Sequence, residues 1–138
     1  MADYLRFEYM LADPRAGNGS LMPYLAMTIS ANSRSAQISG LLDSGASVNA
    51  LPFGIGESLG FNWEFEKTLV RLTGNLARVE CKVIYIDAIV GQFPSTQLIF
   101  AWARVDGFPP ILGQTNFFMN YDVCFYRSRS AFDVRPKE

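Results

Sequence analysis

Stretches in which apolar and polar residues alternate dominate the chain. Between residues 5 and 11, Leu5, Phe7, Tyr9 and Leu11 alternate with more polar neighbours. A period of two residues is typical of a β-strand with one buried face. The same reasoning, together with β-branched and aromatic content, predicts strands at residues 5–11, 25–30, 81–90, 97–105, 121–126 and 131–134.

Turn-forming residues separate these predicted strands. Residues 12–20 are rich in Gly, Asn, Asp and Pro, and the Asn-Gly pair at 18–19 is suited to a β-hairpin. Residues 31–35 form a second polar turn, and the sequence RSRS at 127–130 separates the last two strands. The last two strands are therefore expected to close the chain as a hairpin.

Residues 81–90 differ from the other predicted strands because apolar side chains occupy both alternating sets. This pattern is typical of a strand that is buried from two sides. Helical signals are scarce and are confined to short turns within 51–61 and 113–121. The sequence therefore predicts an all-β fold with one or two short helices.

Composition and charge exclude several classes of protein. The chain has 138 residues, 49% hydrophobic and 18% charged, which is enough apolar material for one globular domain with a core. The net charge is −1 and no run of Lys or Arg occurs, so no nucleic-acid partner is expected. The N-terminus lacks a signal-peptide pattern and the apolar runs are too short to span a bilayer, so a cytoplasmic protein without a membrane partner is expected. Cys81 and Cys124 are then expected to be reduced thiols.

The chain contains no histidine, which excludes the usual Ser-His-Asp and Cys-His mechanisms and most zinc sites. The sequence GESLG at 56–60 matches the pattern of a nucleophile elbow, but Ser58 has no histidine base. We therefore interpret it as a loop, and no metal or other cofactor is expected.

An acidic residue follows two leucines in LLDSGA at 41–46, where an unpaired charge is unfavourable. About seventy residues later, ILGQTNFF at 111–118 combines two apolar residues, a glycine and a short helical stretch. The two sequences, in this order and spacing, resemble the active-site loop and the second signature of aspartic proteases. Because only one Asp-Ser-Gly is present, the chain resembles the half-size retropepsins. The resemblance covers residues 22–135.

The resemblance implies a small, closed or partly open β-barrel of the acid-protease half-domain type. Residues 22–138 would form this single domain, and residues 1–21 an N-terminal extension or strand. It also implies an aspartic endopeptidase in which two carboxylates share a proton and activate a water molecule. Each chain supplies one aspartate, Asp43, so a homodimer acting on a peptide or protein substrate is expected.

The resemblance also assigns roles to the neighbours of Asp43. Ser44 would hydrogen-bond to the other subunit's loop, and Gly45 would allow the backbone to approach the substrate closely. Ala46 and Ser47 would line the cleft and offer backbone groups to an extended peptide. These four residues and Asp43 form the predicted active-site loop.

The second signature would lie behind this loop. Ile111, Leu112 and Gly113 are expected to form a short strand beside it, with the glycine allowing close contact. A flap, a β-hairpin that closes over the substrate, is expected at residues 71–79 with Thr73, Gly74 and Asn75 at its tip. An ordinary surface hairpin is the alternative interpretation of this segment.

The sequence departs from the retroviral pattern at two positions. Ser47 and Gln114 stand where an Asp–Arg ion pair is often found, so the dimer is expected to be braced differently near the cleft. Residues 5–11 and 131–134 are candidates for the terminal strands that join retroviral dimers. Two other functions stay open: an inactive peptide-binding or dimerisation module with the same fold, and a scaffold domain that recruits partners at its sheet edges.

Overall fold

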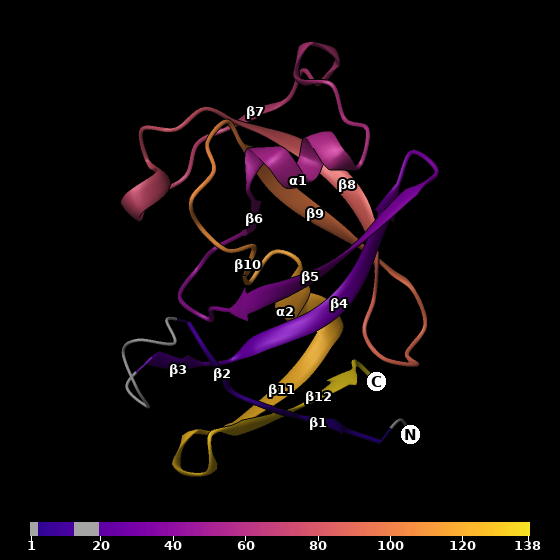
Figure 1. Cartoon of the computed structure of the whole chain (residues 1–138), viewed down its shortest axis with the longest axis vertical. Helices are drawn as coiled ribbons and strands as arrows, with labels where there is room; N and C mark the ends of the chain where they lie inside the picture. The colour runs from indigo at the N-terminus through magenta and orange to yellow at the C-terminus, as the bar shows by residue number, and fades with distance from the viewer. Residues whose placement is uncertain (1–2, 13–19) are drawn as a thin grey trace.

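The chain folds around a closed barrel of β-strands. The structure is a computed structural model that describes residues 3–12 and 20–138. Within these residues, six strands pair in a ring, which closes because β8 pairs with both β9 and β4 (Figure 1). In order around the ring they are β4 (Tyr24–Ala31), β5 (Arg34–Leu42), β10 (Ile111–Leu112), β6 (Asn49–Leu51), β9 (Thr96–Ala103) and β8 (Cys81–Ile89).

Smaller elements surround the barrel. A three-stranded sheet runs in the order β1 (Leu5–Glu8), β12 (Ala131–Pro136) and β11 (Tyr121–Tyr126), and β2 (Met10–Leu11) pairs with β3 (Leu21–Met22). Strand β7 (Leu69–Val70) pairs with β8. The helices are α1 (Phe53–Ser58) and α2 (Phe117–Asn120), with 3-10 helices at Trp63–Phe65, Gly74–Leu76 and Arg127–Arg129.

Most of the strands that the alternation of apolar and polar residues predicts are present in the structure. The predicted closing hairpin forms between β11 and β12, and both predicted helical stretches contain a short α-helix. Between β4 and β5, Asn32 and Ser33 have φ angles of 53° and 61°, so this hairpin has a two-residue turn of the kind that matches strand twist. The predicted Asn-Gly turn at 18–19 lies outside the described residues.

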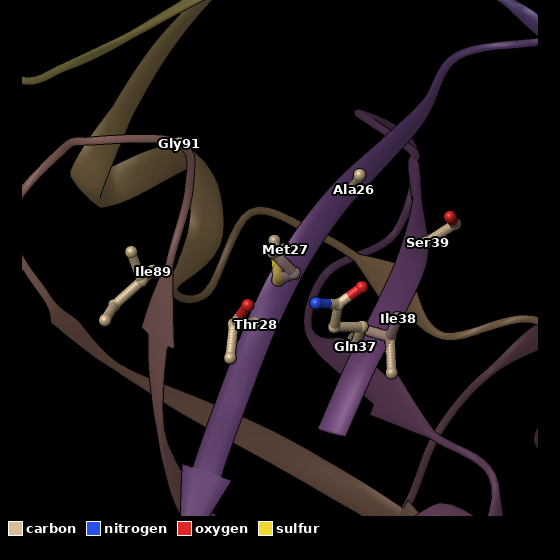
Figure 2. A pocket seen from close by; sticks show the side chains of 8 residues that line it. All are labelled: Ala26, Met27, Thr28, Gln37, Ile38, Ser39, Ile89 and Gly91. Carbon is tan, nitrogen blue, oxygen red and sulfur yellow. The ribbon is translucent and has the colours of Figure 1, made fainter. Parts of the chain in front are cut away.

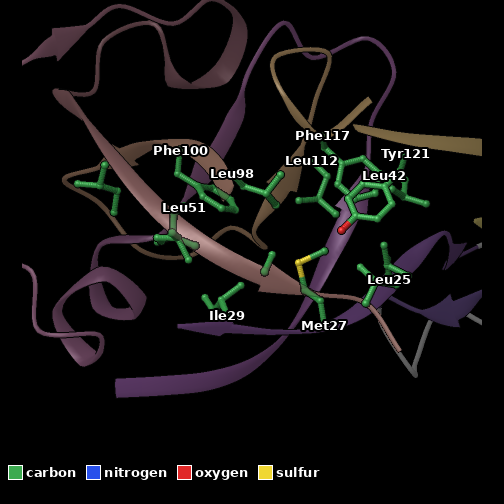
Figure 3. Packing of buried hydrophobic residues seen from close by; sticks show 14 of the residues in the cluster. Leu25, Met27, Ile29, Leu42, Leu51, Leu98, Phe100, Leu112, Phe117 and Tyr121 are labelled. Atoms are coloured by element: carbon green, nitrogen blue, oxygen red, sulfur yellow. The ribbon is translucent and has the colours of Figure 1, made fainter. Parts of the chain in front are cut away.

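The core fills the barrel interior and the space beneath the three-stranded sheet. On β9, Leu98, Phe100 and Trp102 all point inward and are completely buried. Figure 3 shows Leu98 and Phe100 among the leucines and aromatics of β4, β6, β10 and α2. Leu42 at the end of β5 and Leu112 on β10 both belong to this core, and the two strands pair side by side.

The prediction that strand 81–90 is buried from two sides is wrong. Ile84 and Ile86 are buried, but Tyr85 is 56% exposed and Ile89 is 41% exposed. The reason is the barrel geometry: one face of β8 packs on the core, and the other face points away from the barrel. Periodicity could not reveal this, because apolar residues occupy both faces.

Both described cysteines are free thiols. Cys81 is buried in β8 and is therefore a core thiol, whereas Cys124 is only half-buried in β11. Burial raises the pKa of the Cys81 thiol. In the described part of the chain, no helix combines the length and apolar character needed to cross a membrane.

Candidate active site

The loop that carries Asp43 joins the end of β5 to β6. The backbone N–H of Asp43 donates to Leu112 O at 3.0 Å, and Ala46 N–H donates back to Asp43 O at 3.0 Å. The carboxylate oxygen Oδ1 accepts the Gly45 N–H at 3.0 Å. The loop is therefore a tight turn that fixes the aspartate side chain relative to its own backbone.

The second signature lies directly beside this loop. Strand β10 pairs in parallel with the end of β5, placing Ile111 opposite Leu41 and Leu112 opposite Leu42. A Cβ atom on Gly113 would collide with Val48 O and lie 2.8 Å from Ala46 O. Only a glycine permits this approach, because both obstructing atoms belong to the backbone.

A buried asparagine that the sequence analysis did not single out joins these segments. Asn49 is fully buried, and its Oδ1 accepts the Gly113 N–H at 2.8 Å. Its Nδ2 donates to Ile99 O at 2.9 Å and to Asn116 Oδ1 at 3.2 Å, while Asn116 Oδ1 also accepts the Ile99 N–H at 2.9 Å. The signal in the sequence was a polar amide between Val48 and Ala50, inside an apolar strand.

Gln114 occupies the place where the retroviral pattern often has an arginine. Its Nε2 donates to Ser44 O at 2.8 Å, and its backbone N–H donates to Ala46 O at 2.9 Å. Thr115 N–H donates to Ser47 O at 2.9 Å. Hydrogen bonds between uncharged groups thus join the two signatures at the place where retroviral enzymes often have an ion pair.

The active-site loop and the predicted flap segment line one cleft of about 320 Å³. Among the lining residues that the structure describes, Asp43 contributes the only charged side chain. The other lining residues are Gly45, Ala46, Ser47, Val48, Ala50, Ile111 and residues 72–76, which include Thr73, Gly74 and Asn75. Three other predicted site residues do not line it: Ser44 is exposed outside it, and Leu112 and Gly113 are buried behind the loop.

The predicted hairpin turn at the flap tip is wrong in its details. Strands β7 and β8 pair only through Leu69 with Lys82 and Val70 with Cys81, and residues 71–80 connect them. At the predicted tip this connection forms the 3-10 helix Gly74–Leu76, closed by Ala77 N–H donating to Gly74 O at 3.1 Å. A ten-residue connection is long enough to include a helical turn, whereas the usual turn of a β-hairpin has only two to five residues. Its role as a flap stays a prediction.

A second pocket, of about 370 Å³, lies between β4, β5 and the turn after β8. Figure 2 shows its lining, including Thr28, Gln37 and Ile89. None of its eight lining residues is acidic or basic, and Asp43 is not among them. Of these two pockets, only the first has a carboxylate, that of Asp43, among its described lining residues. Among residues 3–12 and 20–138, no three Cys, Asp or Glu side chains gather as a metal site.

Comparisons with known proteins agree on the fold. No family model and no curated protein matches the chain. The crystal structure of a retropepsin-like aspartic protease from Rickettsia conorii is similar with a TM-score of 0.60 and 16% identity, over 97% of this chain and 94% of that one. The EIAV protease in complex with the inhibitor HBY-793 is similar with a TM-score of 0.50 and 19% identity, over 70% of this chain and 86% of that one.

Proposed function

Because the chain has the retropepsin-like fold, we propose that it is an aspartic endopeptidase that acts as a homodimer. Asp43 of each copy would face its counterpart across a twofold axis, and the two carboxyl groups would share one proton. The ionised carboxylate removes a proton from a water molecule, which attacks the peptide carbonyl. The protonated carboxyl donates a hydrogen bond to the carbonyl oxygen as the tetrahedral intermediate forms.

The observation that supports this proposal is the composition of the cleft. Within the described part of the chain, Asp43 is its only ionisable lining residue, and the other lining side chains are small, apolar, hydroxyl or amide groups. Water activation by two carboxylates cannot take place in one copy, since one copy supplies one carboxylate. A second copy related by symmetry supplies the other without any further acidic residue.

The cleft also suits an extended peptide. Val48, Leu72, Leu76 and Ile111 give apolar walls, and the glycine-containing loops at both sides expose backbone groups. A peptide strand that hydrogen-bonds to these backbone groups would place alternate side chains against the apolar walls. We therefore propose a peptide or unfolded protein segment as the substrate, with the 71–80 connection covering it.

One observation favours a second candidate, a peptide-binding module without catalysis. Oδ1 of Asp43 already accepts the Gly45 N–H within one chain, so the carboxylate has a structural role that needs no partner. In this alternative the cleft binds peptides but the two aspartates do not meet. Both candidates use the same cleft, and they differ in whether the two aspartates meet and whether a bond is cleaved.

The test compares Asp43→Asn with Asp87→Asn, a matched change at an exposed position on β8. Both variants and the wild type are incubated with a peptide library, and cleavage is followed by mass spectrometry. Cleavage should be lost in Asp43→Asn and retained in Asp87→Asn, with unchanged circular dichroism in both. An excess of Asp43→Asn should also inhibit the wild type, because mixed dimers hold only one carboxylate. Cleavage by Asp43→Asn at the wild-type rate would refute the proposal, and peptide binding without any cleavage would support the second candidate.

A further inference from the structure

Strands β2 and β3 form an exposed two-stranded ribbon, which we call the N-terminal ribbon (Met10–Leu11 and Leu21–Met22). Met10 pairs with Met22 and Leu11 pairs with Leu21, and directly opposed side chains of an antiparallel pair share a face. One face therefore carries two methionines and the other carries two leucines. Met10 is 42% exposed, Leu11 is 44% exposed and Met22 is 37% exposed.

Such a ribbon is poorly stable in water without a partner. An isolated two-stranded hairpin is marginal, and it becomes stable when further strands or other elements cover its apolar surface. Here both faces carry exposed apolar side chains, Leu11 on one face and Met10 and Met22 on the other. Exposed apolar side chains that gather in one place mark a contact surface more often than single exposed ones.

The N-terminal ribbon lies next to the active-site loop. Tyr24, which follows it closely in the chain, pairs with Leu41 on β5, and Leu42 N–H donates to Pro23 O at 3.0 Å. These bonds bring the end of β3 beside the end of β5, where Asp43 begins the loop. Figure 1 shows β3 beside the tip of the β5 arrow. A second copy that presents its own Asp43 to this one must therefore approach close to the ribbon.

The terminal strands are already paired with each other inside one chain. β1 pairs with β12 from Leu5 opposite Val134 to Glu8 opposite Ala131. The Arg6 guanidinium reinforces this pairing with two bonds to the Asp133 carboxylate, of 2.7 Å and 3.0 Å. The edges at which β1 and β12 meet are thus occupied within one chain and cannot pair across two copies.

We propose that the N-terminal ribbon is the surface on which a second copy of this chain docks. The inference rests on the proposed function, since the second copy is the one that supplies the second Asp43. The methionine face suits this role because flexible thioether side chains adapt to an opposing apolar surface. In a twofold interface each methionine contributes twice to the contact, once in each copy.

The test is the dimer dissociation constant measured by sedimentation velocity over a range of protein concentrations. Met22→Lys and Met10→Lys each place a charge on the ribbon from a different strand, and Ile89→Lys is the matched control on β8, where Ile89 is 41% exposed. Each ribbon variant should raise the dissociation constant by about tenfold or more, because a symmetric interface doubles the effect of each substitution. Ile89→Lys should leave the constant unchanged. Cleavage by the ribbon variants should fall at low protein concentration and recover at high concentration.

The outcomes separate this inference from the proposed function. A wild-type dimer whose dissociation constant neither ribbon variant alters would overturn the inference, even if the protein cleaves peptides. A wild type that stays monomeric at every concentration would overturn it as well. A dimer that the ribbon variants weaken but that cleaves no peptide would support the inference and remove the catalytic part of the proposed function.

Discussion

Replacing Asn49 by alanine tests whether the buried amide holds the active-site loops together. The change removes the acceptor of the buried Gly113 N–H and two donor bonds, to Ile99 O and to Asn116 Oδ1. A buried N–H without an acceptor costs about 1–3 kcal/mol, and each of the other two lost bonds costs about 1 kcal/mol. Asn116 Oδ1 keeps the Ile99 N–H, so it is not left without a partner. The free energy of unfolding should fall by roughly 3–5 kcal/mol, out of the total of about 5–15 kcal/mol that is usual for a domain.

Urea denaturation followed by tryptophan fluorescence measures this loss, because Trp63 and Trp102 are both buried in the native state. Asn62→Ala is the matched control: the same chemical change removes an exposed bond in which Asn62 Oδ1 accepts the Glu64 N–H. A lost N-terminal cap costs about 1 kcal/mol. The Asn49 variant should therefore have a clearly lower denaturation midpoint than the Asn62 variant, with a similar slope.

Equal destabilisation by Asn49→Ala and Asn62→Ala would refute the role of the buried amide in holding the loops together. A second variant, Asn49→Asp, checks the direction of the hydrogen bonds. The introduced carboxyl retains an acceptor for Gly113 N–H, but when ionised it cannot donate to Ile99 O. Because burial raises the pKa of such a group, the destabilisation relative to wild type should increase as the pH rises above about 4. The same size of loss at acidic and neutral pH would contradict this account.

Two further changes test other contacts. Gly113→Ala should lower the free energy of unfolding by at least about 1–3 kcal/mol, because its Cβ would meet the backbone oxygen of Val48, which cannot swing away as a side chain can; an unchanged melting temperature would show that the loops do not approach so closely. Arg6→Gln should destabilise the fold at neutral pH, because the Arg6 guanidinium, chiefly through its hydrogen bonds, holds the pKa of Asp133 below its usual range. That stabilisation is present above the ordinary carboxyl pKa of about 4 and is lost as the pH falls through the lower folded-state value, so the difference in melting temperature between wild type and variant should shrink below about pH 4. An equal difference at pH 7 and at pH 3 would refute the role of the ion pair.

The alternation of apolar and polar residues was enough to place most strands. It correctly predicted the closing hairpin, because period-two alternation is a local property that neighbouring residues reveal. It failed for β8, where apolar side chains occupy both faces and only the barrel decides which face is covered. The two helical stretches were also local signals.

The sequence by itself determined the kind of fold and singled out Asp43, because a charge in an apolar run followed by a glycine signature is unusual enough to recognise without coordinates. Only the tertiary structure decided how the loop is held. The bonds of Asn49 to Gly113 and Ile99 join residues 64 and 50 positions apart, and no local pattern encodes such a pairing. The sequence also did not reveal that the N-terminal ribbon lies beside the active-site loop, for the same reason. Contacts between distant segments depend on how the barrel closes, and closure is a property of all its strands together.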